Sequence, residues 1–154
     1  MKNPPLIAAD QLRHAWWFVA RPTSVGVLAL VVDDEARVLL VKLSYRRGWY
    51  LPGGGVRRKE AVEEALRREL REEVGVEPTA PPRLHGVYSN FAERKSDHIV
   101  VFVVERWRRS PVRSLEIEDS RFFAPDELPE DVSLPAGRRI AEYAAGTTGV
   151  HGPW

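Results

Sequence analysis

Residues 53–76 read GGGVRRKEAVEEALRRELREEVGV, a run of glycines followed by a charged segment with helical periodicity. The glycines at 53–55 predict a backbone turn, and the segment after them predicts a single amphipathic helix. The helix should end at Gly75 and Pro78, because glycine readily adopts a left-handed cap and proline cannot continue a helix. The rest of the chain lies on either side of this turn and helix.

The predicted helix has two unlike faces. If Val62 marks the middle of the inward face, a rotation of ~100° per residue places on that face Ala65, Leu66, Glu69 and Glu73. Glu72 lies at the edge of this face, and the residues roughly opposite, toward solvent, are Glu64, Arg67 and Arg71. Carboxylates on an apolar face are strongly disfavoured unless a cation pairs with them. Three converging carboxylates next to a glycine turn therefore suggest a site for a hard divalent cation.

Residues 54–76 resemble the Nudix box, G-x5-E-x7-R-E-U-x-E-E-x-G-U, in which U is aliphatic. Every fixed position is filled, by Gly54, Glu60, Arg68, Glu69, Leu70, Glu72, Glu73, Gly75 and Val76. A solvated helix with Glu/Arg pairs four residues apart would explain Glu63 and Arg67, but not the acids on the apolar side. We therefore expect a Nudix hydrolase.

The resemblance implies hydrolysis of a phosphoanhydride bond in a nucleoside diphosphate linked to a moiety X, with water attacking phosphorus and Mg²⁺ (or Mn²⁺ in its place) bound. Because Mg²⁺ prefers oxygen ligands, we assign the metal to Glu69, Glu72 and Glu73. The family adds the carbonyl of Gly53 as a ligand. It also implies an ion pair between Arg68 and Glu60 that fixes the loop against the helix and orients the ligands. These two residues and the three glutamates form the expected catalytic set.

The general base stays open between a glutamate of the box and an acid further along the chain. Glu69 is our first choice, ahead of Glu73. The later candidates are Glu93, Asp97, Glu116, Glu118 and Asp119. The segment EIEDSRFF resembles one that donates an acid to the metal in this family, so Glu118 or Glu116 is expected as a supplementary ligand. Each of these acids taken alone is better explained as a surface residue.

Substrate contacts are expected around the glycines and in the segment before them. Gly54 and Gly55 let the backbone approach phosphate or metal closely. Stacking on a base is open to Tyr45, Trp49, Tyr88 and Phe91, although Trp49 and Tyr88 equally suit the core. Phosphate contacts are expected from Lys42, Arg46, Arg47 and Arg94. Lys59 stands where many family members have glycine, so the turn should differ locally there.

Composition excludes several other classes of protein. A chain of 154 residues with a formal net charge of +1 predicts one domain, residues 1–154, and no dedicated binding of duplex DNA. The absence of cysteine excludes disulfides, thiolate metal sites and the cysteine-dependent isomerases of the fold, and it suits the cytoplasm. No apolar run is long enough for a signal peptide or a membrane span.

The predicted fold class is α/β, a Nudix-like α/β/α sandwich with a mixed sheet and an additional N-terminal helix. The helix over residues 6–20, in an extension covering 1–22, would lie over the core or form a homodimer contact. Strands are expected at 25–32 and 37–43, joined as a hairpin, and at 83–89, 98–107 and 115–123. Residues 49–52 should be extended, 78–82 a linker, 106–113 a basic hairpin tip, 135–145 a helix and 146–154 a flexible tail.

Two alternative functions are compatible with this fold. A catalytically silent nucleotide-binding regulator should have lost acids of the box, whereas this chain keeps all of them. An RNA 5′-end pyrophosphohydrolase is disfavoured by the near-neutral charge. The sequence does not specify the substrate, and nucleoside triphosphates are the default.

Overall fold

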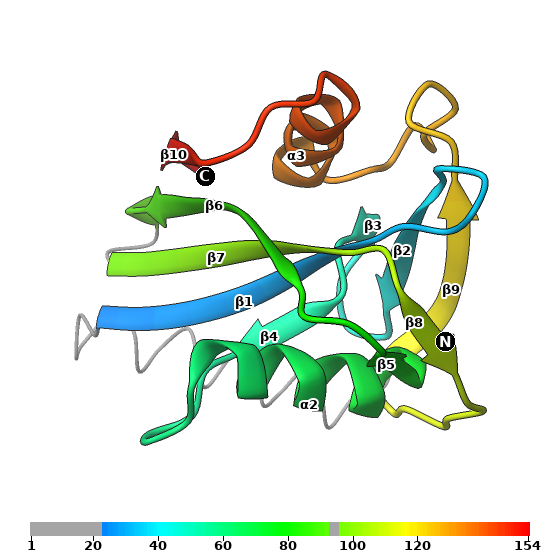
Figure 1. Cartoon of the computed structure of the whole chain (residues 1–154), viewed down its shortest axis with the longest axis horizontal. Coiled ribbons are helices and arrows are strands. Elements are labelled where there is room, and N and C mark those ends of the chain that lie inside the picture. The colour runs from blue at the N-terminus through cyan, green and yellow to red at the C-terminus, as the bar shows by residue number, and fades with distance from the viewer. Residues whose placement is uncertain (1–22, 93–95) are drawn as a thin grey trace.

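The computed structural model describes residues 23–92 and 96–154, in which two helices lie on opposite sides of β-sheet (Figure 1). The largest sheet has the order β10-β6-β7-β1-β4. Its strands are β1 (Thr23–Val31), β4 (Gly53–Gly55), β6 (Arg83–Asn90), β7 (Ser96–Val104) and β10 (Val150–Pro153). Parallel pairs (β1 with β7, β10 with β6) and antiparallel pairs (β1 with β4, β6 with β7) make the sheet mixed, as predicted. The predicted N-terminal helix lies outside the described residues.

Two smaller sheets and the helices complete the fold. One sheet has the order β3-β2-β9, from strands β2 (Val38–Leu43), β3 (Trp49–Tyr50) and β9 (Ile117–Phe123). The other pairs β5 (Val76–Pro78) with β8 (Trp107–Arg109). The helix of the charged segment is α2 (Val62–Val74), and α3 (Leu134–Ala144) lies on the other side of the main sheet (Figure 1).

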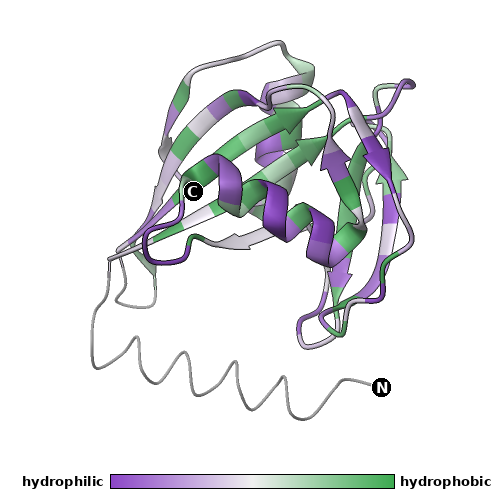
Figure 2. Cartoon of the chain, turned by 60° about the horizontal axis from the view of Figure 1, so that its bottom comes forward, coloured by the Kyte–Doolittle hydropathy of each residue, from purple (hydrophilic) through white to green (hydrophobic). Residues whose placement is uncertain are grey.

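The core consists of two clusters, one on each face of the main sheet. Alternate residues of β1 enter different clusters: Leu30 packs with Ile140 of α3, whereas Ala29 packs with Leu66 and Leu70 of α2. All of these side chains are fully buried. β1 reads as a nearly continuous apolar run because both of its faces are covered. The outer side of α2 is hydrophilic (Figure 2).

The predicted hairpin of residues 25–43 is only partly correct. The turn forms, with Ala36 in the left-handed region at φ 59° and its N–H donating to the Asp33 carbonyl. However, β1 and β2 join different sheets, and between them Val32 and Val38 form an isolated antiparallel bridge. Both edges of β1 are already paired, with β4 and β7, so β2 has to turn away.

Three other predictions are wrong in part. Residues 53–55 form strand β4, not a turn, and lie antiparallel to β1. The strand predicted over 98–107 ends at Val104, and Trp107 begins β8, which occupies part of the predicted basic tip and pairs with β5. Residues 150–153, within the predicted flexible tail, form strand β10, which pairs with β6, and the N–H of Trp154 donates to the Ser89 carbonyl. These differences arise from pairing between distant segments, which local sequence does not encode.

Candidate active site

Helix α2 is fixed at both ends. At its start the Glu64 carboxylate accepts from the N–H of Ala61 (3.1 Å). At its end Gly75 takes the predicted left-handed conformation, φ 67°, and the Arg109 side chain donates to the Val74 carbonyl (3.0 Å). A cation at a helix C-terminus also interacts favourably with the helix dipole. The acids of α2 therefore project from a rigid element.

The predicted inward face of α2 is largely correct. Ala65, Leu66 and Glu73 are buried, and the Glu69 side chain is 16% exposed. Val62 is wrong as the middle of that face, since it is 36% exposed. Burial begins only at Ala65, which means that the first turn of the helix is uncovered. The outward residues Glu64 and Arg71 are exposed, as predicted, and Arg67 is partly exposed.

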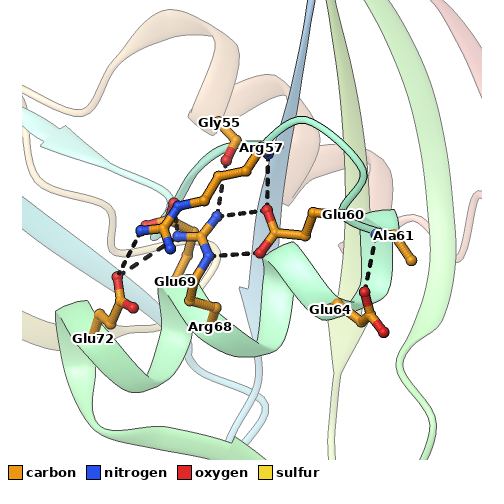
Figure 3. Close-up of polar contacts among 8 residues, drawn as sticks. All are labelled: Gly55, Arg57, Glu60, Ala61, Glu64, Arg68, Glu69 and Glu72. Atoms are coloured by element: carbon orange, nitrogen blue, oxygen red, sulfur yellow. Dashed lines mark hydrogen bonds and ion pairs between the residues drawn. The ribbon is translucent and has the colours of Figure 1, made fainter.

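Arg68 connects the loop before α2 to the acids of the helix (Figure 3). Its guanidinium donates to both carboxylate oxygens of Glu60 (2.7 and 2.9 Å), to the Gly55 carbonyl (3.0 Å) and to Glu69 Oε1 (2.5 Å). The hydrogen bond from Arg68 is the main reason why the pKa of Glu60 falls to about 2, and the same pairing raises the pKa of Arg68. The ion pair implied by the family resemblance is present.

Glycines 53 and 54 face the two inward acids. The N–H of Gly53 donates to Glu73 Oε2 (2.8 Å). A Cβ at Gly54 would lie 2.7 Å from the Glu69 carboxylate, so only glycine leaves room for that group. Burial is the main cause that raises the pKa of Glu73 to about 8; the charges of Glu69, Glu116 and Glu72 act in the same direction, and the hydrogen bond from Gly53 acts against them.

These acids supply the donor type that Mg²⁺ requires, but their carboxylates have other partners. Within residues 23–92 and 96–154, no three acidic or histidine side chains are grouped closely enough to hold a metal ion as they stand. Glu69 pairs with Arg68, Glu73 accepts from Gly53, and Glu72 pairs with Arg68 and Arg57. The set fits a divalent cation in chemistry and charge, since a buried carboxylate among like charges lacks a counter-ion. Binding requires some of these pairs to open.

Among the later acids, Glu116 is the one whose charge raises the pKa of Glu73. The sequence predicted either Glu118 or Glu116 as the supplementary metal ligand. Glu118 is exposed and lies with Glu73 on the wall of a 590 Å³ cleft between the end of α2 and the segment leading into β9. Asp119 pairs with Arg121 (2.8 Å), and Asp97 accepts from the Ser24 hydroxyl (2.9 Å). Glu93 lies outside the described residues.

The predicted substrate-binding residues have mixed outcomes. Trp49 and Tyr88 are 4% and 1% exposed, so the core alternative is correct and neither ring is free to stack on a base. Lys42 Nζ lies 5.0 Å from the centre of the Trp49 ring and 3.9 Å from Asp131. The Arg46 guanidinium lies over the ring of Tyr50 at 5.5 Å.

Further predicted contacts are Tyr45, Gly55, Phe91 and Arg94. Tyr45 lies in the loop that connects β2 to β3 and is partly buried, whereas Phe91 is 68% exposed. A Cβ at Gly55 would meet no protein atom within 4 Å, and the Gly55 carbonyl accepts from Arg68. Arg94 lies outside the described residues.

Sequence reasoning missed Arg57. Its guanidinium lies 3.8 Å from the Glu72 carboxylate, and its backbone N–H donates to Glu60 (2.8 Å). Arg57 occupies a variable position of the box, so the motif carries no signal for it.

Comparison with known proteins agrees with the geometry. The family profile described as NUDIX domain matches residues 22–143. An RNA pyrophosphohydrolase of Hydrogenovibrio crunogenus is 41% identical over 56 residues, 36% of this chain and 33% of that protein. The nucleoside triphosphatase NudI of Klebsiella pneumoniae is 44% identical over 54 residues, 32% of this chain and 38% of that protein. The similarity thus spans little more than a third of these curated relatives.

Solved structures extend the likeness to most of the chain. The MutT NUDIX hydrolase from Burkholderia pseudomallei is 28% identical with a TM-score of 0.68, covering 78% of this chain and 97% of that one. A NUDIX hydrolase from Nitrosomonas europaea, 24% identical, shares the fold with a TM-score of 0.70 over 83% and 93% of the two chains. None of the helices in the described part of this chain has the length and apolarity needed to cross a membrane.

Proposed function

The chain belongs to the Nudix hydrolase family, and we propose that it hydrolyses a nucleoside diphosphate linked to a moiety X with the help of Mg²⁺. The observation that carries this proposal is the position of Glu69 and Glu73. Both carboxylates lie on the covered side of α2, against Gly54 and Gly53. A bound cation would balance the negative charge of the two carboxylates together.

Glu69, Glu72 and Glu73 would hold the ion, with the Gly53 carbonyl and Glu116 or Glu118 as further donors. When bound, the ion supplies charge neutralisation at the diphosphate and Mn²⁺ can replace Mg²⁺. The Arg68–Glu60 pair holds the loop that carries Gly55 against α2, and thereby positions these donors. Gly54 leaves space for the Glu69 carboxylate next to the strand.

In the reaction, the oxygen of water forms a new bond to one phosphorus and the bridging P–O bond on that phosphorus breaks. The bridging oxygen leaves with the second phosphoryl group, giving a nucleoside monophosphate and a phosphorylated X. The proton of the water passes to a carboxylate. We assign this role to Glu69, because it is one of the two acids facing inward and Arg68 fixes its orientation.

Two substrate classes are supported by separate observations. Nucleoside triphosphates are favoured by the likeness to the nucleoside triphosphatase. The 5′ end of RNA is favoured by the relative called RNA pyrophosphohydrolase, although a net charge of +1 gives little attraction for a long polyanion. The intact set of box acids argues against a silent regulator.

A substrate screen with purified protein tests the proposal. Nucleoside triphosphates, ADP-sugars, NADH, dinucleoside polyphosphates and triphosphorylated RNA are each incubated with Mg²⁺ or Mn²⁺, and the products are separated by chromatography. Glu69→Gln and Glu72→Gln should lower kcat by roughly 100-fold or more while thermal melting shows a folded protein. Arg67→Ala, on the outer side of α2, is the matched control and should keep its activity. Near-normal turnover in either glutamine variant would refute the assignment.

A further inference from the structure

The acidic site contains two arginines in very different settings. The Arg68 side chain is 10% exposed and donates to Glu60, Glu69 and the Gly55 carbonyl. The Arg57 side chain is 64% exposed, and its guanidinium forms one longer ion pair, 3.8 Å, with Glu72. Both guanidinium groups approach the same oxygen of Glu72 (Figure 3). Arg68 is therefore a fixed structural cation, whereas Arg57 can exchange its partner at little cost.

The backbone of Arg57 is anchored although its side chain is exposed. Its N–H donates to the Glu60 carboxylate (2.8 Å), and its carbonyl accepts from the N–H of Glu60 (3.1 Å). Just before it, the N–H of Val56 donates to the Val25 carbonyl of β1 (2.9 Å). Glu60 is itself held by two hydrogen bonds from Arg68. The backbone of Arg57 is thus fixed at the edge of the acidic site, while its exposed side chain is free to reorient.

The charges of the site point to what Arg57 does there. Three carboxylates, those of Glu60, Glu69 and Glu72, face the two guanidinium groups, and the buried Glu73 adds a fourth carboxyl group to the same site. A cation that takes Glu72 as a ligand competes with Arg57 for the same carboxylate. A polyphosphate then brings further negative charge to the rim, and a guanidinium matches two phosphate oxygens in geometry as well as charge.

We propose that Arg57 exchanges partners during the catalytic cycle: it pairs with Glu72 in the metal-free protein and with phosphate oxygens of the substrate once the metal holds Glu72. This role rests on the proposed function of the site. It makes Arg57 a substrate-positioning residue and a weak competitor of the metal. The two effects have opposite signs, and each can be measured alone.

The first measurement uses the metal without substrate. The nucleotide-free protein is titrated with Mn²⁺ in a calorimeter. Arg57→Ala should bind Mn²⁺ about 2- to 5-fold more tightly than wild type, which is the factor expected from removing an exposed ion pair. Arg67→Ala is the matched control, because it removes another partly exposed arginine–glutamate pair, with Glu63 at 2.8 Å, on the far side of α2. It should leave the Mn²⁺ affinity unchanged. Thermal melting checks that both variants are folded.

The second measurement uses a nucleoside triphosphate with saturating Mg²⁺. Arg57→Ala should raise KM by about 10-fold with little change in kcat, the loss expected when a hydrogen bond between charged groups is removed. Arg57→Lys should recover part of the loss. A non-hydrolysable α,β-methylene analogue should show the same ordering in its Kd.

The outcomes separate the two proposals. Arg57→Ala that matches Arg67→Ala in both measurements, or that binds Mn²⁺ more weakly than wild type, would overturn the exchange while leaving the hydrolase assignment intact. A wild-type protein that does not bind Mn²⁺, or a Glu72→Gln variant that binds it normally, would overturn the metal assignment and the exchange with it.

Discussion

Alanine at position 54 should separate folding from catalysis. A Cβ there would lie 2.7 Å from the carboxylate carbon and Oε1 of Glu69 and 2.9 Å from Oε2. Carbon atoms normally approach to about 3.5 Å, so the carboxylate has to retreat by roughly 1 Å. The retreating group is the end of a flexible side chain, so the free energy of unfolding should change by less than about 1 kcal/mol. A displacement of this size at a reacting centre costs roughly 100-fold in rate.

Two neighbouring glycines provide the controls. At Gly55 a Cβ would meet no protein atom within 4 Å, so Gly55→Ala should keep its stability. At Gly53 the backbone has φ +137° and a Cβ would lie 2.1 Å from the Val27 carbonyl oxygen, so Gly53→Ala should lose more than about 3 kcal/mol of stability. Urea unfolding and steady-state kinetics on the best substrate measure both quantities. A Gly54→Ala protein with wild-type kcat, or one as unstable as Gly53→Ala, would refute this reasoning.

Three further predictions concern pH, backbone strain and a second buried cluster. The pKa of Glu60 is lowered from 4.5 to about 2, mainly by Arg68. The stability that comes from the charge of Glu60 is therefore complete above pH 4.5 and is lost as the pH falls toward 2. Glu60→Gln should make the decline of Tm across this pH range less steep, and an unchanged decline would contradict the pairing. Lys59 has φ 63°, which costs about 1 kcal/mol for a residue with a Cβ. Lys59→Gly should raise the free energy of unfolding, measured in urea, by about 0.5 kcal/mol, because the larger entropy of glycine in the unfolded chain offsets part of the relieved strain. A lower free energy of unfolding would contradict the strain. Glu142→Ala should cost about 3 kcal/mol with kcat unchanged, because it leaves the buried Arg139 without its carboxylate at 2.8 Å; a loss below about 1 kcal/mol in urea unfolding would argue against that dependence.

The sequence predicted the parts of the site that depend on local spacing. The end of α2 at Gly75 and the inward direction of Glu69 and Glu73 follow from offsets within one short segment, and the pair between Arg68 and Glu60 is implied by the family resemblance of the same segment. At Lys59 the structure shows a non-glycine residue at positive φ, a conformation that favours glycine, and the expectation of a locally different turn stays a prediction.

The parts that could not be predicted depend on contacts between distant segments. Nothing in three consecutive glycines indicates that they pair as a strand with β1, or that β2 leaves β1 for β9. The choice between Glu116 and Glu118 depends on the start of β9, where the ladder with β2 has an irregular register at Lys42 and Leu43. One residue of slip reverses which side a strand residue faces, and the sequence does not reveal the slip.

Strand β10 has a consequence for the solution behaviour of the molecule. β10 lies parallel to β6, with Val150 opposite Gly86. The carbonyl oxygen of Val150 would be only 2.4 Å from a Cβ at position 86. Without β10, the eight-residue β6 would present a row of unpaired amide and carbonyl groups at the border of the sheet, with Leu84 and Val87 already open to solvent. Such borders template intermolecular pairing and aggregation. β10 moves the edge of the sheet from the eight-residue β6 to a four-residue strand that ends at Pro153, and a short edge strand with a proline offers fewer groups for such pairing.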